Sequence, residues 1–308
     1  MFFSFCKNSD PSWRERAARY GALVTDPPLS ALGHRQARET ANFLHEIISN
    51  SINTGDNRSS GASASGVDAI LVSPYLRTIQ TAAPTSDIFN IPLSVENGLS
   101  ESHATNRNYI PSSHERFIYF PQIDPTYIPL VQAVVPTPGH TCAVTGYECE
   151  SFPIDYMKRM ESLAALLECK YVGQSIVLFS HAASLALVAA LCHCSLRDMT
   201  FAPCGVYCME RRTTSRSSSS SSSSSTNEDD CRHTPWTLVQ SGHTNIEHVS
   251  ENSVTTYPWG YEDEHFNETE TEKQQEGGRS IDMDYFVRRN HDIDTTIFKS
   301  FDTFAALA

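Results

Sequence analysis

Two short, uninterrupted apolar runs constrain the fold of this 308-residue chain more than any other feature of its sequence. They are AILV at 69–72 and SIVLF at 175–179. Runs of four or five residues without polar alternation are typical of strands buried on both faces, which occur mainly in parallel sheets covered by helices. A segment with helical spacing follows each run, at 75–83 and at 185–192. The pattern therefore predicts βαβ units and an α/β fold.

The remaining segments complete a three-layer arrangement, a mostly parallel sheet flanked by helices. Ser30 is a good helix N-cap, and apolar residues then repeat at helical spacing as far as Ile48. We predict a further strand at 91–95 and a helix at 152–169. The apolar stripe of that helix consists of Met157, Met160, Leu163, Ala164 and Leu167.

Composition divides the chain into one folded domain and a tail. Nine consecutive serines at 217–225 cannot bury apolar surface, but the apolar segments VYCME and WTLVQ lie on either side. We interpret 211–232 as a serine-rich insertion between two strands. The segment 261–308 holds 12 acidic and 5 basic residues and shows no apolar periodicity in its middle. We therefore predict a domain at 1–255 and an acidic, largely disordered tail at 256–308.

Charge and cysteine content argue against several classes of protein. The 23 Lys and Arg against 36 Asp and Glu leave a net charge of −13, which disfavours a general nucleic-acid binder. No run approaches the roughly 18 apolar residues of a membrane span, and the opening MFFSFCKNSD lacks the basic region of a secretory signal. Nine cysteines in that context are interpreted as reduced thiols. We expect a cytoplasmic protein, with the nucleus as the alternative.

Three predicted strands are each followed by a polar side chain of a different chemical type. Arg77 comes shortly after AILV, Glu101 shortly after the strand at 91–95, and His181 just after SIVLF. In such sheets, ligands bind at the carboxyl ends of the strands. Arginine presents a fork of donors suited to phosphate oxygens, and histidine and glutamate transfer protons. Taken singly, each residue has a plain structural reading, as a surface arginine, a solvated carboxylate or a helix-capping histidine, but together they indicate phosphoryl transfer.

Four segments carry a resemblance to a known family. They are DPPLSALGHRQA (26–37), VSPYLRTIQTA (72–82), ENGLSE (96–101) and VLFSHAASLALVAAL (177–191). In this order they resemble the histidine phosphatase, or phosphoglycerate mutase-like, superfamily. The spacing is most similar to the eukaryotic branch that contains the ubiquitin-associated and SH3 domain-containing tyrosine phosphatases. The resemblance implies a phosphoglycerate mutase-like α/β fold over roughly residues 10–250.

The resemblance also assigns roles to the three residues. It makes Arg77 a clamp on the phosphoryl oxygens, Glu101 the acid/base carboxylate and His181 the second histidine, which stabilises the transferring phosphoryl group. The family's nucleophile is a histidine in an Arg-His-Gly or Arg-His-Ser motif at the end of the first strand, and this sequence contains neither motif. If FFSF at 2–5 is a remnant of that strand, Cys6-Lys7-Asn8 stands where Arg-His-Gly is expected.

Two explanations for the missing motif remain open. The chain is either a pseudo-phosphatase or the product of a truncated gene model whose true start lies upstream. We favour the second, because a long-decayed site need not retain Arg77, Glu101 and His181 together. As written, the chain is expected to have little or no phosphatase activity, so whether it is an enzyme stays open.

The leading hypothesis is hydrolysis of a phosphate monoester through a phosphohistidine, with no cofactor and no metal. The alternative is a catalytically inactive module that binds phosphorylated ligands or proteins. The expected partner is a phosphorylated small molecule or phosphoprotein, not nucleic acid or a membrane, and a homodimer is left open. Cysteines at 192, 194, 204 and 208 superficially suggest zinc, but their spacing fits no common zinc pattern. The insertion at 106–145, rich in Pro and Tyr, is predicted to cover the pocket and set the substrate.

Overall fold

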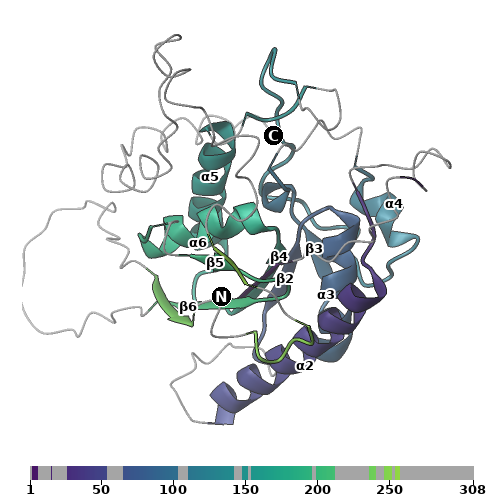
Figure 1. Ribbon diagram of the computed structural model, residues 1–308, viewed down its shortest axis with the longest axis vertical. Coiled ribbons are helices and arrows are strands. Elements are labelled where there is room, and N and C mark those ends of the chain that lie inside the picture. Colours follow the sequence, from purple (N-terminus) through teal and green to yellow (C-terminus); the bar gives the residue numbers. More distant parts are fainter. Residues whose placement is uncertain are drawn as a thin grey trace, which may run out of the picture.

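The structure is a computed structural model, and it describes most of the predicted domain (Figure 1). The described residues are 2–5, 15, 26–53, 65–102, 110–141, 148–151, 154–195, 199–211, 236–240, 246–251 and 254–256. The predicted tail beyond Thr256 lies outside them, as do the serine run and His103, a residue close to Glu101 in the sequence.

A six-stranded sheet with the strand order β3-β2-β4-β1-β6-β7 forms the centre of the fold. Its strands are β1 (Phe2–Phe5), β2 (Ala69–Val72), β3 (Leu93–Val95), β4 (Ile176–Ser180), β6 (Val206–Glu210) and β7 (Thr237–Gln240). The first four positions of the order are mutually parallel, whereas β6 runs antiparallel to β1 and β7 antiparallel to β6. A separate antiparallel pair consists of β5 (Thr200–Phe201) and β8 (Thr255–Thr256). The prediction of a mostly parallel α/β sheet is confirmed.

The four residues of β1 lie at the junction between the parallel and antiparallel parts of the sheet. Phe2 pairs with Val177 of β4 on one side and with Cys208 of β6 on the other. Phe5 pairs with Ser180, the residue immediately before His181. The carboxyl end of β1 therefore reaches the same rim of the sheet as the carboxyl end of β4.

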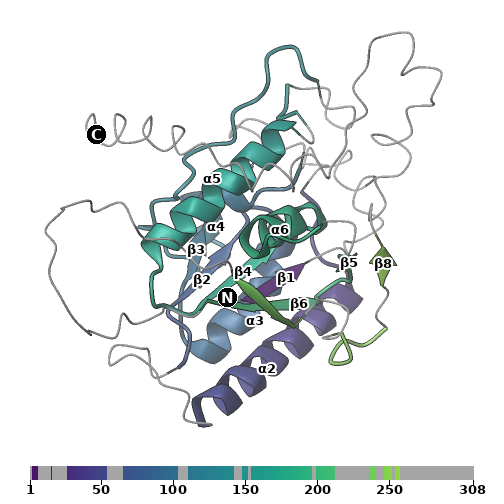
Figure 2. The same ribbon diagram turned by 90° about the vertical axis from the view of Figure 1, so that its left-hand side faces the viewer.

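Two pairs of helices cover the two faces of the sheet (Figure 2). One face carries α2 (Ala31–Asn53) and α3 (Leu76–Phe89), and the other carries α5 (Ile154–Lys170) and α6 (Leu185–Cys192). Alternation along β4 produces this division, since Val177 and Phe179 pack in one apolar cluster and Leu178 in the other. All five residues of the predicted stripe of α5 are buried. The three-layer architecture is confirmed.

Several predicted boundaries differ from the structure, and two of the differences have a clear cause. The helix predicted to end at 83 continues through Pro84 to Phe89, because Phe89 is buried and Asn90 closes the helix in a left-handed conformation. The strand predicted at 91–95 begins only at Leu93, since the Ile91 N–H donates to Ser86 O at the end of α3. At the start of α2 the predicted cap is confirmed, because the Gly33 N–H donates to Ser30 Oγ over 3.1 Å.

The strands that precede and follow the serine-rich segment in the sequence are neighbours in the sheet. Glu210 at the end of β6 pairs with Thr237 at the start of β7. The segment therefore leaves and re-enters the sheet at adjacent positions. Among the residues described, no helix is long and apolar enough to cross a membrane.

The described residues also include three short helical elements. They are η1 (Asn97–Leu99) after β3, α4 (Ser113–Phe117) in the insertion and η3 (Ala182–Ser184) after β4. Residues from the first two also line a pocket described below.

Candidate functional site

The structure brings the three predicted site residues together at the rim of the sheet. Arg77 Nη2 lies 3.2 Å from Glu101 Oε2 and 2.9 Å from His181 Nδ1. His181 Nδ1 and Glu101 Oε2 are 3.3 Å apart. Arg77 comes from the first turn of α3, Glu101 from the loop after η1 and His181 from the end of β4. Residues separated by about a hundred positions thus form one cluster around a single guanidinium nitrogen.

His181 is neutral in this arrangement. Burial, together with the positive charges of Arg77 and Arg159, holds its pKa well below the usual range. Because an arginine can only donate, His181 Nδ1 accepts from Arg77, and the ring proton is assigned to Nε2, which donates to Ser73 Oγ over 2.7 Å. The edge of the Tyr75 ring completes the enclosure at 5.0 Å between ring centroids.

Glu101 is the member of the cluster that solvent reaches. Its side chain is 23% exposed, whereas those of Arg77 and His181 are 10% and 0% exposed. The guanidinium carbon of Arg77 lies 4.7 Å from the Tyr75 ring centroid, so one flat face of the arginine is covered. A ligand that reaches Arg77 from solvent must therefore arrive on the side occupied by Glu101.

Arg159 of α5 supports the cluster, and the sequence analysis missed it. All five of its N–H groups donate to protein acceptors. Two go to the carboxylate of Glu150, each over 2.8 Å, and the others to the backbone carbonyls of Gly98, Ser100 and Glu101. Burial opposes its charge, but the Glu150 carboxylate outweighs burial and raises the pKa of Arg159. Arg159 thereby fixes the backbone that carries Glu101.

A second buried ion pair fixes the backbone that carries Arg77. Asp26 accepts a hydrogen bond from the Leu76 N–H at the start of α3 over 2.6 Å, and its other oxygen pairs with Arg116 of α4. Arg116 also donates to Pro74 O over 3.4 Å. This pair ties the insertion to the loop between β2 and α3.

The two glutamates of the ENGLSE segment have different environments. Glu96 is fully buried, and its carboxylate accepts four hydrogen bonds within the protein, from the backbone N–H groups of Gly98, Leu130 and Val131 and from the Tyr127 hydroxyl. Gly98 has no room for a side chain, because an added Cβ would lie 2.9 Å from Leu163 Cδ1. Glu96 and Gly98 therefore shape the loop, and Glu101 is the glutamate that faces the cluster.

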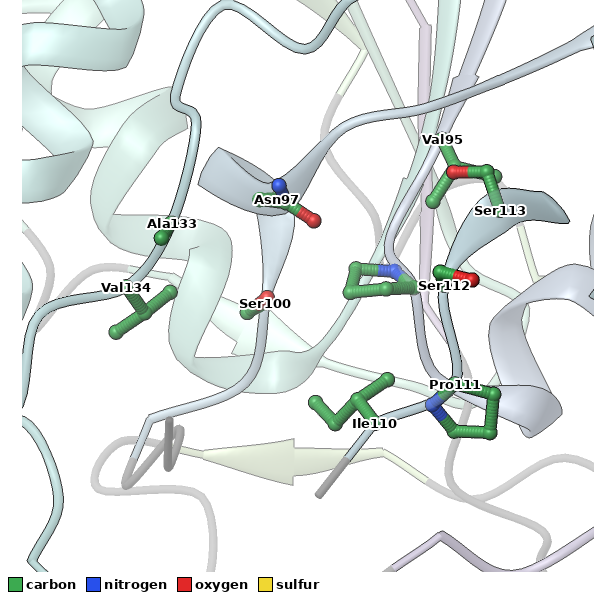
Figure 3. Close-up of a pocket in the computed structure, with 10 residues that line it drawn as sticks. Val95, Asn97, Ser100, Ile110, Pro111, Ser112, Ser113, Ala133 and Val134 are labelled. Atoms are coloured by element: carbon green, nitrogen blue, oxygen red, sulfur yellow. The ribbon is translucent and has the colours of Figure 1, made fainter. Parts of the chain in front are cut away.

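A pocket lies beside this cluster, between the η1 loop and the insertion (Figure 3). The described part of the insertion contributes residues at 110–113 and 133–134 to its lining. Pro74 and Ser100 also line the pocket; Pro74 follows Ser73, which contacts His181, and Ser100 precedes Glu101.

Of the other sequence candidates, the cysteines do not form a metal centre within the part of the chain that is described. No group of three or more His, Cys, Asp or Glu side chains there could hold a metal ion. The Cys192 thiol donates to Met209 Sδ over 3.1 Å, and burial raises its pKa to about 12.

Comparison with known proteins gives distant structural resemblances. No protein-family model matches the chain, and no curated protein matches its sequence. Solved structures similar to it include the ecdysone phosphate phosphatase from Bombix mori in complex with tungstate, with 19% identity and a TM-score of 0.47 over 74% of this chain and 96% of that chain.

Two further structures show a comparable resemblance. A mycobacterial glucosyl-3-phosphoglycerate phosphatase is 15% identical, with a TM-score of 0.43 over 79% of this chain and 97% of that one. A phosphoserine phosphatase mutant from Entamoeba histolytica, in complex with phosphoserine, is 15% identical, with a TM-score of 0.43 over 80% and 98%. At these values, the function of this chain must be inferred from its own residues.

Proposed function

We propose that the cluster of Arg77, Glu101 and His181 is a phosphoryl-binding site, and that the chain is a phosphatase of the histidine phosphatase superfamily. One observation carries the proposal: an arginine, a carboxylate and a buried neutral histidine, from three separate elements, meet within 3.3 Å at the rim of a parallel sheet. The order of the segments that supply them, SPYLRTIQTA, ENGLSE and SHAAS, agrees with that family.

In the proposed reaction, each residue has a distinct task. Arg77 exchanges Glu101 for the phosphoryl oxygens, to which its fork of donors is matched. Glu101, released toward solvent, takes up a proton from water and then gives it to the leaving-group oxygen. The bound dianion favours the protonated form of His181, which then donates to the phosphoryl group. Arg159 and Asp26 keep these side chains in position.

The step that this sequence does not obviously support is nucleophilic attack. A phosphohistidine requires an imidazole nitrogen that attacks phosphorus and a water that then hydrolyses the P–N bond. Cys6-Lys7-Asn8 follows β1 in the chain, where the family resemblance expects Arg-His-Gly, and these residues lie outside the described part. Loss of the nucleophile is the observation that favours the alternative function, an inactive module that binds phosphorylated ligands or proteins.

Titration of the full chain with inorganic phosphate tests the site. The His181 ring resonances are followed by NMR and assigned with His181→Gln. We expect them to shift with an affinity near the millimolar range, since part of the family's cationic clamp is missing. Arg77→Ala should abolish the shift, whereas Arg35→Ala, which removes a half-exposed surface arginine, should not. Resonances that stay still in the wild type would show that there is no shared anion site.

A triple substitution distinguishes the enzyme from the binding module. Cys6→Arg, Lys7→His and Asn8→Gly together restore the family motif directly after β1. The unmodified chain should not hydrolyse an aryl phosphate above background, and the triple variant should. Retained phosphate binding without turnover in the triple variant would favour the inactive module.

We also propose the setting in which the site works. The ligand is a phosphorylated small molecule or phosphoprotein, and the compartment is the cytoplasm or the nucleus. The six cysteines that the structure describes, all thiols rather than disulfides, are consistent with a reducing compartment. Fractionation of cells that express the tagged chain tests this.

A further inference from the structure

Tyr75 stands at a helix position where a residue of its type is not expected. It is the N-cap of α3, a position that favours Ser, Thr, Asp or Asn because their short side chains accept hydrogen bonds from the first turn. The Tyr75 side chain makes no such bond. Asp26, from a distant part of the sequence, accepts from the Leu76 N–H instead, over 2.6 Å. A local departure of this kind, compensated from elsewhere, indicates that the side chain serves another purpose.

The Tyr75 ring is part of the Arg77 cluster. It meets His181 edge-on, with 5.0 Å between the ring centroids and an angle of 78° between the ring planes. The guanidinium carbon of Arg77 lies over its face, 4.7 Å from the centroid. The phenol oxygen is one ring radius and one C–O bond away from that centroid. An anion that pairs with Arg77 can therefore bring an oxygen within hydrogen-bonding reach of the Tyr75 hydroxyl.

The hydroxyl of Tyr75 has no hydrogen-bond partner in the part of the chain that the structure describes, although the residue is only 6% exposed. Two other tyrosines near the site differ in this respect. The Tyr156 hydroxyl lies 3.1 Å from Ser184 Oγ, and the Tyr127 hydroxyl donates to Glu96 over 2.9 Å. The Tyr75 oxygen is also not among the unpartnered polar atoms that are fully enclosed, so a solute can reach it. Because buried polar groups are normally hydrogen-bonded, this hydroxyl lacks a partner that a ligand can supply.

The Tyr75 hydroxyl is protonated at neutral pH and is therefore a donor. Burial is the main reason that the pKa of Tyr75 lies above its ordinary value. The positive charge of Arg77 opposes the effect of burial, and the negative charges of Glu101 and Asp26 reinforce it. An anionic phosphate oxygen is a strong hydrogen-bond acceptor, so the hydroxyl and the anion are complementary.

From these observations we infer that Tyr75 is a further ligand-binding residue of the site, and that its hydroxyl donates a hydrogen bond to an oxygen of the anion held by Arg77. The inference rests on the proposed function, since it requires a phosphoryl group at Arg77. It adds to that site a neutral donor, on a residue to which the sequence analysis gave no role. When the anion displaces Glu101, the Tyr75 hydroxyl gains the acceptor that it lacks in the free protein.

Tyr75→Phe tests the inference, because it removes one oxygen atom and keeps the ring that contacts Arg77 and His181. Binding of inorganic phosphate to the full chain is followed through the His181 ring resonances at one fixed pH. We expect the dissociation constant to rise about tenfold, since a hydrogen bond to a charged group is lost. The pKa of His181 in the free protein should stay unchanged. Stability against denaturant should not fall, because no hydrogen bond within the protein is removed.

Tyr156→Phe is the matched control, because it removes the same atom from a tyrosine whose hydroxyl is bonded within the protein, to Ser184 Oγ. This variant should bind phosphate within about twofold of the wild type and should be less stable. Titration with sulfate forms a second control. Sulfate has no proton to donate at neutral pH, so a Tyr75 hydroxyl that donates to the anion predicts a similar loss of affinity for sulfate in Tyr75→Phe.

Each outcome decides one level of the proposal. Unchanged phosphate binding by Tyr75→Phe would overturn the inference and leave the site at Arg77 standing. A loss for phosphate but not for sulfate would also overturn it, because the hydroxyl would then accept rather than donate. A weaker affinity accompanied by a shifted His181 pKa or by reduced stability would assign Tyr75 a structural role instead. Absence of binding of either anion to the wild type would overturn the proposed function and this inference with it.

Discussion

Arg77 and Arg159 are both buried arginines that contact the Glu101 segment, yet their surroundings differ in one respect. Arg159 gives every N–H to a protein acceptor, and its carboxylate partner Glu150 is only 4% exposed in its side chain. Arg77 pairs with Glu101, which is 23% exposed, and with a neutral imidazole. Water can stabilise Glu101 after it is displaced from Arg77, but it cannot reach Glu150 in the same way. This difference is why the proposed function assigns ligand binding to Arg77 and a supporting role to Arg159.

The largest expected effect on the free energy of unfolding comes from removing Arg159. Arg159→Ala leaves the Glu150 carboxylate buried without its cation, which costs about 3–5 kcal/mol of the free energy of unfolding. Chemical denaturation of the full chain measures it. Arg35→Ala, at an exposed pair, should change the free energy of unfolding by less than about 0.5 kcal/mol. If Arg159→Ala also lowered the free energy of unfolding by less than about 0.5 kcal/mol, the distinction between Arg77 and Arg159 would be contradicted.

Removing Arg77 should lower the free energy of unfolding by less than removing Arg159. We expect Arg77→Ala to lower the free energy of unfolding by about 1–2 kcal/mol, because Glu101 can take up water in place of the arginine. The same variant should raise the pKa of His181, since the positive charge of Arg77 contributes to lowering it. NMR titration of the ring measures this. A His181 pKa that does not move would mean that burial alone sets it.

The smallest effect is a dependence of stability on pH. The unfolded histidine titrates near 6.5 and the folded one well below. Below pH 6.5 the unfolded state therefore binds more protons than the folded state, and stability falls as pH is lowered from 6.5 toward the folded pKa. The slope for one proton is at most about 1.4 kcal/mol per pH unit.

Comparison with His181→Gln isolates this contribution from other histidines, such as His34, whose pKa burial also lowers. The variant should lose less stability between pH 6.5 and pH 5 than the wild type does. Arg77→Ala should give an intermediate slope of stability against pH, because the pKa of His181 in the folded variant moves closer to 6.5. Identical slopes in all three proteins would contradict a neutral, buried His181.

The sequence was sufficient to predict the bounds of an element where the local apolar pattern and the burial of its residues agree. AILV and the helix at 185–192 have the predicted bounds, because both are apolar throughout and most of their residues are buried. The helix before Phe89 was predicted too short, since a proline in its interior lowers its local propensity while packing of Phe89 sustains it. The order of strands also allowed Arg77, Glu101 and His181 to be grouped, because all three follow strand ends.

The supporting residues could not be grouped in the same way. Asp26 and Arg116 are 90 positions apart, and no periodicity links them. Arg159 did leave a signal, because it lies between Met157 and Met160 on the apolar stripe of its helix. A charged residue in such a stripe indicates a buried partner. Which carboxylate and which carbonyls it would meet depends on the loops, whose paths the pattern does not determine.

The place of β1 in the sheet also has a consequence for the time course of synthesis. Phe2 pairs with Val177 and with Cys208, so β1 must wait for partners that are made 175 and 206 residues later. At translation rates of roughly 5–20 residues per second, the delay until both partners exist is on the order of 10–40 seconds. Throughout it the apolar FFSF segment lacks at least one of its neighbours in the sheet, and the parallel and antiparallel parts remain unjoined. The sheet can therefore close around β1 only after both β4 and β6 have left the ribosome.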